Sequence, residues 1–381
     1  MKPPRYIDWA VWTFVVLASV LAVFSALSVW ANRQALDRQW VGSSTTRLLD
    51  NANVRGALSI FLVNELYDDV NVAGELRRGL PKNLRVLAAP IAFGLRPVAE
   101  RSAYELLATA PVRQLVRQAT LVAHAQFLNI IYNRGQRVTA VYLALRPVLL
   151  ALAARIGFER QVAQRLPPDA GRFDLLNPRT LDLLRTSIDV VRPLSRYLAI
   201  LVAVLYAAAI AVARGRRRHA LLRCGLGLLA AAVAIFVIRR VGQTVVLDRA
   251  VTSPDARPGG AAAYEILTSI LVTIAWSAMA VALAAIVFAW LAGPTQPAYS
   301  IRRLLAPAFV RHAAVLWVVV SLAIAGGFAL VPVADWSGLV ARLVGTAVAV
   351  GGIEMLRRIT SREHPDGAWT WHRQQPVGRD G

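Results

Sequence analysis

Two groups of side chains in this sequence are of types that do chemistry in proteins. Glu65, Asp68 and Asp69 bring three carboxylates close together, and carboxylate oxygens are the ligands that Ca²⁺ prefers. Their spacing does not match a calcium loop, so we interpret them as the solvated end of a helix. His124 could act as a base, but it follows Arg117 at helical spacing on the polar face of a predicted helix. We interpret His124 as an ordinary surface or hydrogen-bonding residue.

Motifs of the major enzyme classes are absent from the sequence. There is no P-loop, no GxSxG elbow, no HExxH pair and no dinucleotide fingerprint. One cysteine, Cys224, excludes an intrachain disulfide and the cysteine spacing of a zinc site. Further carboxylates exist that the spacing does not pair: Asp50, Glu100, Glu105, Asp174 and Asp182. The sequence therefore favours a protein that is not an enzyme and assigns no catalytic, cofactor or metal site; a hydrolase or transferase acting at the outer surface stays the weaker alternative.

The composition is that of a membrane protein. Hydrophobic residues make up 56% and charged residues 17%, and the mean hydropathy is +0.49, whereas soluble domains carry about 25% charged residues. The net charge is +21. The sequence does not contain the basic stripe with interleaved aromatic residues that would indicate nucleic-acid binding. The basic residues of the segment 31–192 are compatible with anionic lipid or an anionic envelope polymer nearby, but a solvated domain surface is the preferred interpretation.

Apolar segments predict six transmembrane helices. The first, Trp9–Trp30, is long enough to cross about 30 Å of hydrocarbon and has tryptophan at both ends. We interpret residues 1–30 as a cytoplasmic start and an uncleaved signal anchor; the alternative is a signal peptide cleaved near Ala31. Residues 193–355 hold the other five spans, and 356–381 form a cytoplasmic tail. The five spans are predicted at 194–213, 220–238, 266–291, 313–331 and 337–355.

Arginines predict the orientation of the chain. Because basic loops stay in the cytoplasm, the cluster after the second span places both termini inside. These topology determinants are Arg214, Arg216, Arg217 and Arg218. Residues 239–264 are then an outer loop, in which Pro254, Pro258, Gly259 and Gly260 indicate flexibility.

Small residues recur every four positions in the last span. This spacing lets helices approach closely, so the face predicts helix packing within the bundle. A dimer face is the alternative, which leaves a homo-oligomer open. The residues are Ser337, Ala341, Gly345 and Ala349.

Residues 31–192 predict a mostly helical α+β domain on the extracytoplasmic side, between the first and second spans. Apolar residues at helical spacing predict helices from Val54 to about Tyr67, over 83–108 with interruptions at Pro90 and Pro97, and from Pro111. The apolar run Leu84–Leu95 is too short to cross a bilayer and is expected in the core or against the outer leaflet. Two strands are predicted at Arg137–Leu145 and Arg172–Leu176; pairing them would give a small sheet packed by helices, but the sequence leaves their pairing open.

The runs RVTAVYLALRPVLLALAARIGF, RLPPDAGRFDLL and LDLLRTSIDVVRPL carry a resemblance. They resemble an uncharacterised family of multi-pass integral membrane proteins common in actinobacteria and other bacteria. The similarity extends from the LLDNANVRGAL region through the last span, although many members have Asp where this chain has Ala144. The resemblance implies a location in the bacterial cytoplasmic membrane but no activity.

Together these patterns favour a membrane protein whose extracytoplasmic domain binds or senses an envelope partner, lipid or wall component. The alternative is a transporter or transporter subunit, because one span, a large outer domain and five further spans follow the order of elements in half of an RND-type pump. Such proton-coupled pumps need acidic residues at the membrane centre, and the predicted fourth span has no ionisable residue.

Overall fold

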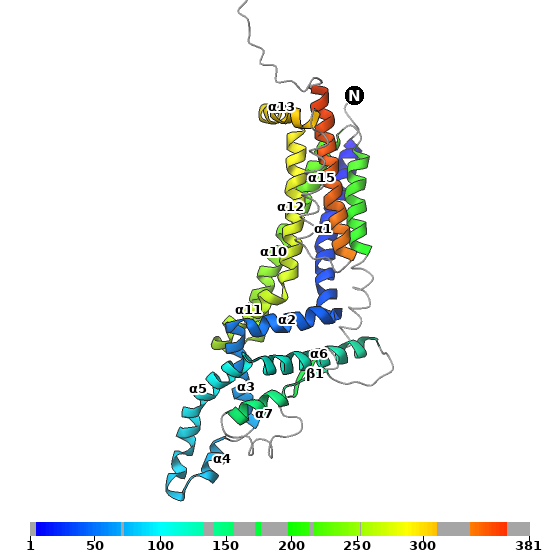
Figure 1. Cartoon of the computed structure of the whole chain (residues 1–381). Helices are drawn as coiled ribbons and strands as arrows, with labels where there is room; N and C mark the ends of the chain where they lie inside the picture. Colours follow the sequence, from blue (N-terminus) through cyan, green and yellow to red (C-terminus); the bar gives the residue numbers. More distant parts are fainter. Residues whose placement is uncertain are drawn as a thin grey trace, which may run out of the picture. The chain divides into compact units, whose positions relative to one another are not determined.

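The protein forms two compact units in the computed structural model (Figure 1). Residues 5–69, 72–132, 141–155, 172–176, 197–213, 216–251, 253–310 and 336–363 are described. Unit 1 comprises Met1–Leu27, Leu194–Phe236 and Thr273–Gly381, and unit 2 comprises Ser28–Pro193 and Val237–Val272.

Three helices are long and apolar enough to cross a membrane, which makes this a multi-pass membrane protein. They are α1 (Arg5–Leu36), α10 (Arg217–Ala250) and α12 (Ser269–Leu291), with apolar stretches at Asp8–Gln34, Arg217–Arg249 and Ser269–Leu291. They cover the first, third and fourth predicted spans.

The other predicted spans are described only in part. The second coincides with a shorter apolar helix, Tyr197–Val212. The sixth lies within α15 (Trp336–Glu363), and the fifth, 313–331, lies outside the described residues. A bundle of six spans therefore stays a prediction.

Small residues let the helices of unit 1 pack closely. A Cβ on Gly225 of α10 would lie 2.8 Å from Ile286 Cγ1 and 3.1 Å from the Ala282 carbonyl oxygen, both on α12. Val15 of α1, Ala209 of the helix Tyr197–Val212 and Cys224 of α10 share one buried cluster. Because apolar side chains gain little from burial when lipid is the alternative, such close contacts hold membrane helices together.

Unit 2 is a stack of amphipathic helices. Its chain runs through α2 (Arg38–Asp50), α3 (Ala52–Asp69), α4 (Val72–Gly79), the 3₁₀ helix η1 (Lys82–Leu87), α5 (Ala88–Leu107), α6 (Ala110–Tyr132) and α7 (Arg146–Arg155). The side chains of Leu49, Leu66, Leu107, Leu149 and Leu152 are almost fully buried in one core. Burying each contributes about 1.5–3 kcal/mol.

Side-chain caps set where the first helices of unit 2 begin. Asp37 accepts hydrogen bonds from the backbone N–H groups of Gln39 and Trp40, at 2.9 and 3.0 Å, and so caps α2. Asn51 does the same for α3 through the N–H of Asn53, at 3.0 Å. Each cap satisfies backbone donors that the first helical turn leaves free, which stabilises a helix by about 1 kcal/mol.

The described strands form one antiparallel pair. Strand β1 (Val141–Ala144) pairs with β2 (Arg172–Leu176), and Ala144 lies opposite Arg172. The sequence predicted both strands but left their pairing open, and β2 has the predicted bounds. The first part of the longer predicted strand, 137–140, lies outside the described residues.

The prediction of an outer loop over 239–264 is wrong. Helix α10 continues to Ala250, and η2 (Pro254–Ala256) and α11 (Arg257–Leu267) follow. The prolines that indicated flexibility occupy first turns of helices, where the missing N–H costs nothing. Helix α11 packs on α3, and both belong to unit 2.

Two expectations for the central helices also need correction. Helix α5 is continuous through Pro97, because Pro97 removes only one helical hydrogen bond and Phe93, whose carbonyl loses it, lies on an exposed face. His124 is buried rather than on the surface of α6. Helix α2 covers the side of α6 that carries His124, as the approach of Gly42 to Arg117 shows. The spacing of apolar residues in α6 does not reveal that its polar side is covered as well.

Candidate functional site

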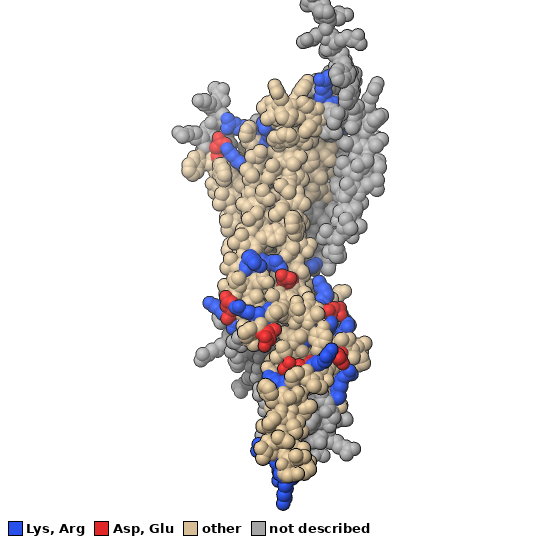
Figure 2. All heavy atoms as spheres, turned by 90° about the vertical axis from the view of Figure 1, so that its left-hand side faces the viewer, with Lys and Arg blue, Asp and Glu red and all other residues tan. Residues whose placement is uncertain are grey.

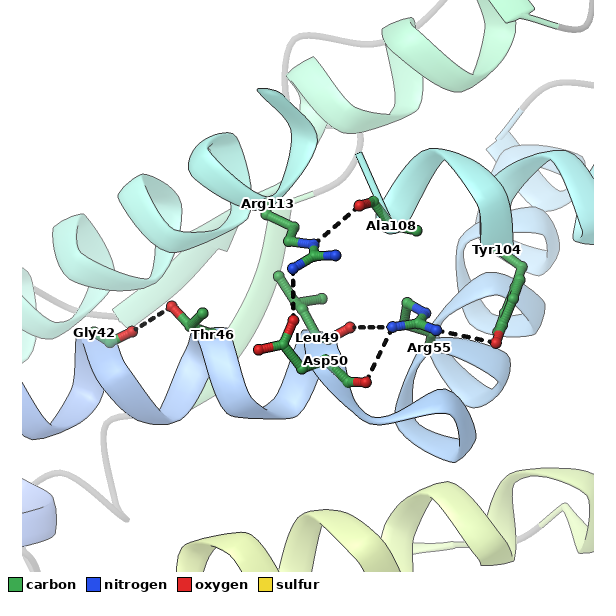
Figure 3. A network of polar contacts seen from close by, with 8 residues as sticks. All are labelled: Gly42, Thr46, Leu49, Asp50, Arg55, Tyr104, Ala108 and Arg113. Atoms are coloured by element: carbon green, nitrogen blue, oxygen red, sulfur yellow. Dashed lines mark hydrogen bonds and ion pairs between the residues drawn. The ribbon is translucent and has the colours of Figure 1, made fainter. Parts of the chain in front are cut away.

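A polar network joins the end of α2 to the α5–α6 corner (Figure 3). Arg55 donates to the carbonyl oxygens of Leu49 and Asp50, at 2.9 and 3.1 Å, and to the Tyr104 hydroxyl at 3.1 Å. Its guanidinium also lies over the Tyr104 ring, 5.0 Å from the ring centre. Arg113 binds the Asp50 carboxylate and donates to the Ala108 carbonyl. These contacts satisfy the carbonyls at helix ends, so the network is structural.

The carboxylates that the sequence left unpaired are held by arginines. Asp50 is bound by Arg113, Glu100 lies 3.4 Å from Arg96, and Glu105 lies 3.2 Å from Arg155. The side chain of Asp174 and the whole of Asp182 lie outside the described residues. Within the described residues, no group of three His, Cys, Asp or Glu side chains could hold a metal ion. The described carboxylates thus form no acid–base pair.

A second polar contact lies where α11 meets α12. Trp30 Nε1 donates to the Leu267 carbonyl oxygen at 3.1 Å, and Gln34 donates to the same oxygen. Arg239 Nε donates to the Thr268 hydroxyl at 2.9 Å. The break at Thr268 frees helical carbonyls, and these side chains satisfy one of them.

Tyr264 completes this contact by donating to the Arg239 carbonyl at 3.0 Å. Burial raises the pKa of the Tyr264 phenol, and the Arg239 guanidinium opposes part of the rise. The phenol therefore stays protonated and remains a donor. The polar contact between α11 and α12 is therefore structural, and its described side chains expose no reactive group.

Helices α4 and α5 form one end of unit 2 (Figure 1), and exposed apolar side chains of η1 and α5 cluster there. The side chains of Val86 and Phe93 are 85% and 78% exposed. We call this the tip surface; its apolar residues are Leu84, Val86, Leu87, Ile91, Phe93 and Val98, all exposed. Contiguous apolar patches on a protein surface mark interaction sites.

Helix packing determines which side of α5 faces outward. Ala88, Ala92, Ala99 and Ala103 are buried on one side, where α5 packs on α3 and its start packs on α4. Tyr67 of α3 donates to the Ala92 carbonyl at 3.1 Å. Because alanines occupy the inner side, the larger apolar side chains are left on the outer side.

Only one charged residue, Arg96, lies between Val86 and Val98, and it folds back against the protein. Arg96 donates to the Asn64 side chain, lies 3.4 Å from Glu100 and lies over the Tyr67 ring. Burial raises the pKa of Tyr67, the Arg96 guanidinium opposes the rise, and Glu100 adds to it. Arg96 is therefore held towards Asn64 and Glu100 with its side chain 40% exposed, and every other side chain of this stretch is uncharged.

Basic side chains border the tip surface. Arg77, Arg78, Lys82 and Arg85 are exposed, and the acidic residue beside them, Glu75, lies 3.1 Å from Arg78. Figure 2 shows blue Lys and Arg atoms at the lower end of the molecule and an uncharged tan surface directly above them. The tip surface thus combines an apolar centre with a cationic border.

Three of the four arginines predicted to determine topology are described, and they lie at one end of unit 1. Arg216 lies 3.3 Å from Asp8 of α1, and Arg218 donates to the Ala289 carbonyl of α12 at 2.9 Å. Arg217 begins α10, and Arg214 lies outside the described residues. The start of α1, the start of α10 and the end of α12 therefore share one basic end.

Arg302 of α13 (Gln296–Val310) was not singled out from the sequence. Its side chain is 3% exposed and donates to the carbonyls of Leu291 and Gly293, the second at 2.8 Å. A cation at a helix C-terminus is favourable because the last carbonyls carry partial negative charge. An arginine a few residues after a Gly-Pro pair was the available signal.

The small-residue face of the last helix is described in part. Gly345 faces Val281 of α12, whose Cγ2 would lie 3.7 Å from a Cβ there. Farther along α15, a Cβ on Gly352 would lie 2.4 Å from the Phe288 ring, so Gly352 makes the closer approach to α12. Ala349 is half-buried, and the side chains of Ser337 and Ala341 lie outside the described residues.

The chain matches no protein-family model, no curated protein and no solved structure. The three candidate spans define the class, a multi-pass membrane protein. The function is therefore inferred from the chain's own surface.

Proposed function

We propose that this protein is a multi-pass protein of the bacterial cytoplasmic membrane whose extracytoplasmic domain, built around unit 2, binds an envelope component through the tip surface. The observation that carries the proposal is the uncharged, exposed face of residues 86–98 with its basic border. An apolar surface held in place by a folded helix is suited to binding, because a partner that covers it removes apolar area from water. Among the described residues of the tip surface, acidic and basic side chains do not come together around a common site. This favours binding over catalysis.

Six spans with both termini in the cytoplasm complete the proposal. The basic end of unit 1 supports this orientation, because Arg216, Arg218 and Arg302 gather there, as expected for the cytoplasmic side. The alternative of a transporter stays a prediction, and no specific contact in unit 1 favours it.

Labelling of single cysteines tests the orientation. In a Cys224→Ala background, Arg101→Cys, outside the tip surface, is expected to react with a membrane-impermeant maleimide in intact cells, whereas Arg217→Cys reacts only after lysis. Both positions are exposed, so burial does not limit the reaction. Labelling of Arg217→Cys alone in intact cells would reverse the orientation.

Photo-crosslinking in intact cells tests the binding. A photoreactive residue in place of Val86 or Phe93 is expected to form a specific adduct with lipid, polymer or protein. The same residue at Val122 of α6 is the matched control, because Val122 is also exposed, at 56%, but lies outside the tip surface. Equal adducts at all three positions, or none at Val86 and Phe93, would contradict the proposal.

A further inference from the structure

We propose that the tip surface binds an anionic phospholipid bilayer, with Val86 and Phe93 inserted among the headgroups and the basic border on lipid phosphates. This inference rests on the proposed function and names its partner.

Shape and polarity of the tip surface match the boundary between headgroups and hydrocarbon. An interfacial segment buries an apolar face about 5–10 Å deep and keeps cations at headgroup level. Val86 and Phe93 are largely exposed. Arg85, next to Val86, is exposed and belongs to the basic border, whereas Arg96 donates to Asn64 and lies 3.4 Å from Glu100. Insertion therefore places apolar side chains in the bilayer and leaves Arg85 at the level of the headgroups.

Charge selects the kind of bilayer. Arg77, Lys82 and Arg85 are exposed beside the apolar residues, and the described acid there, Glu75, already faces Arg78. Each Lys or Arg near an anionic surface adds about fivefold to binding, from about 1 kcal/mol per charge. A neutral bilayer offers the apolar contact without this gain.

The same charges argue against a second copy of the chain as the occupant. Two copies joined through this surface would bring their basic borders together, and like charges at an interface oppose association. A bilayer of anionic lipid covers the apolar residues and neutralises the border at once.

The tip surface is also preorganised. Ala88 and Ala92 are buried, and the Tyr67 hydroxyl binds the Ala92 carbonyl, so the first turns of α5 are already anchored to α3. Binding therefore needs little ordering of the backbone, which would otherwise lower the affinity.

Vesicle flotation tests the inference on the full chain. The protein is placed in phosphatidylcholine nanodiscs and mixed with vesicles of phosphatidylcholine alone or with phosphatidylglycerol. Wild-type protein is expected to float with the phosphatidylglycerol vesicles, and less so as salt is raised. Val86→Asp/Phe93→Asp is expected to lower the apparent vesicle affinity roughly tenfold or more, and Lys82→Glu/Arg85→Glu by a similar factor.

Matched controls keep the test specific. Val122→Asp introduces the same charge at an exposed apolar position of α6, and Arg38→Glu reverses an exposed charge at the start of α2. Both are expected to float like the wild type, and all variants should keep the wild-type melting temperature because each position is exposed.

Equal flotation of wild type and Val86→Asp/Phe93→Asp would overturn the inference, and so would equal binding to both kinds of vesicle. A dimer in detergent that the double variant dissociates would also overturn it, in favour of a second copy. If flotation fails but adducts with protein or polymer form at Val86, the proposed binding function is kept and the inference of a lipid partner is wrong. If the Val86 adducts are absent too, both proposals fall.

Discussion

Gly259→Ala is expected to lower the melting temperature of the full chain, whereas Gly56→Ala is expected to raise it. Both glycines lie in helices of unit 2. A Cβ on Gly259 would lie 2.4 Å from the Ala57 Cβ and 2.7 Å from the Asn53 carbonyl oxygen, while a Cβ on Gly56 meets nothing within 4 Å. The Asn53 oxygen belongs to the backbone of α3, so the helices must separate to admit the methyl group.

The expected cost of Gly259→Ala is about 1–3 kcal/mol, the range for overpacking a close contact. Gly56→Ala is expected to gain about 0.5–1 kcal/mol, because alanine loses less backbone freedom in a helix. For a unit of this size, each kcal/mol shifts the melting temperature by roughly 2–4 °C. Thermal unfolding in detergent measures both variants, and a stabilising Gly259→Ala would show that α11 does not pack closely on α3.

Arg55→Met is expected to destabilise unit 2 by about 2–3 kcal/mol. Methionine keeps part of the apolar stem but leaves the Leu49 and Asp50 carbonyls and the Tyr104 hydroxyl without their charged donor (Figure 3). Hydrogen bonds from charged groups contribute about 1.5–3 kcal/mol each, and solvent replaces some of these because the site is only partly buried. Chemical denaturation followed by tryptophan fluorescence measures the loss.

Arg101→Met is the matched control for this substitution. The Arg101 side chain is 86% exposed, and its nearest carboxylate, Glu105, lies 4.0 Å away, so the expected change is about 0–0.5 kcal/mol. Arg55→Lys should recover only part of the loss, because one ammonium group does not match the fork of a guanidinium. Equal effects of Arg55→Met and Arg101→Met would show that the network does not hold the α2–α3 corner.

Local patterns predicted several elements because their causes are local. Pro111 marks the first turn of α6, and the first, third and fourth predicted spans coincide with long apolar helices. In each case the signal is the residue's own backbone preference or the hydropathy of one segment, and neither depends on a distant partner.

Errors arose where a segment's environment comes from elsewhere in the chain. Pro254, Pro258 and Gly259 are turn signals when taken alone, but the prolines begin helices and the glycine lets α11 approach α3. His124 looked exposed because the pattern of α6 does not show that α2 covers it.

The tip surface shows the same division. The sequence by itself determined that Leu84–Leu95 is apolar, too short to span a membrane and nearly free of charge, because those are properties of composition. Whether that run is buried or exposed was decided by the tertiary structure. Alanines at 88, 92, 99 and 103 pack inward, and Asn64, Tyr67 and Glu100 draw Arg96 inward. The large apolar side chains are left outside because contacts with α3 and α4, which precede α5 in the chain, occupy its other side.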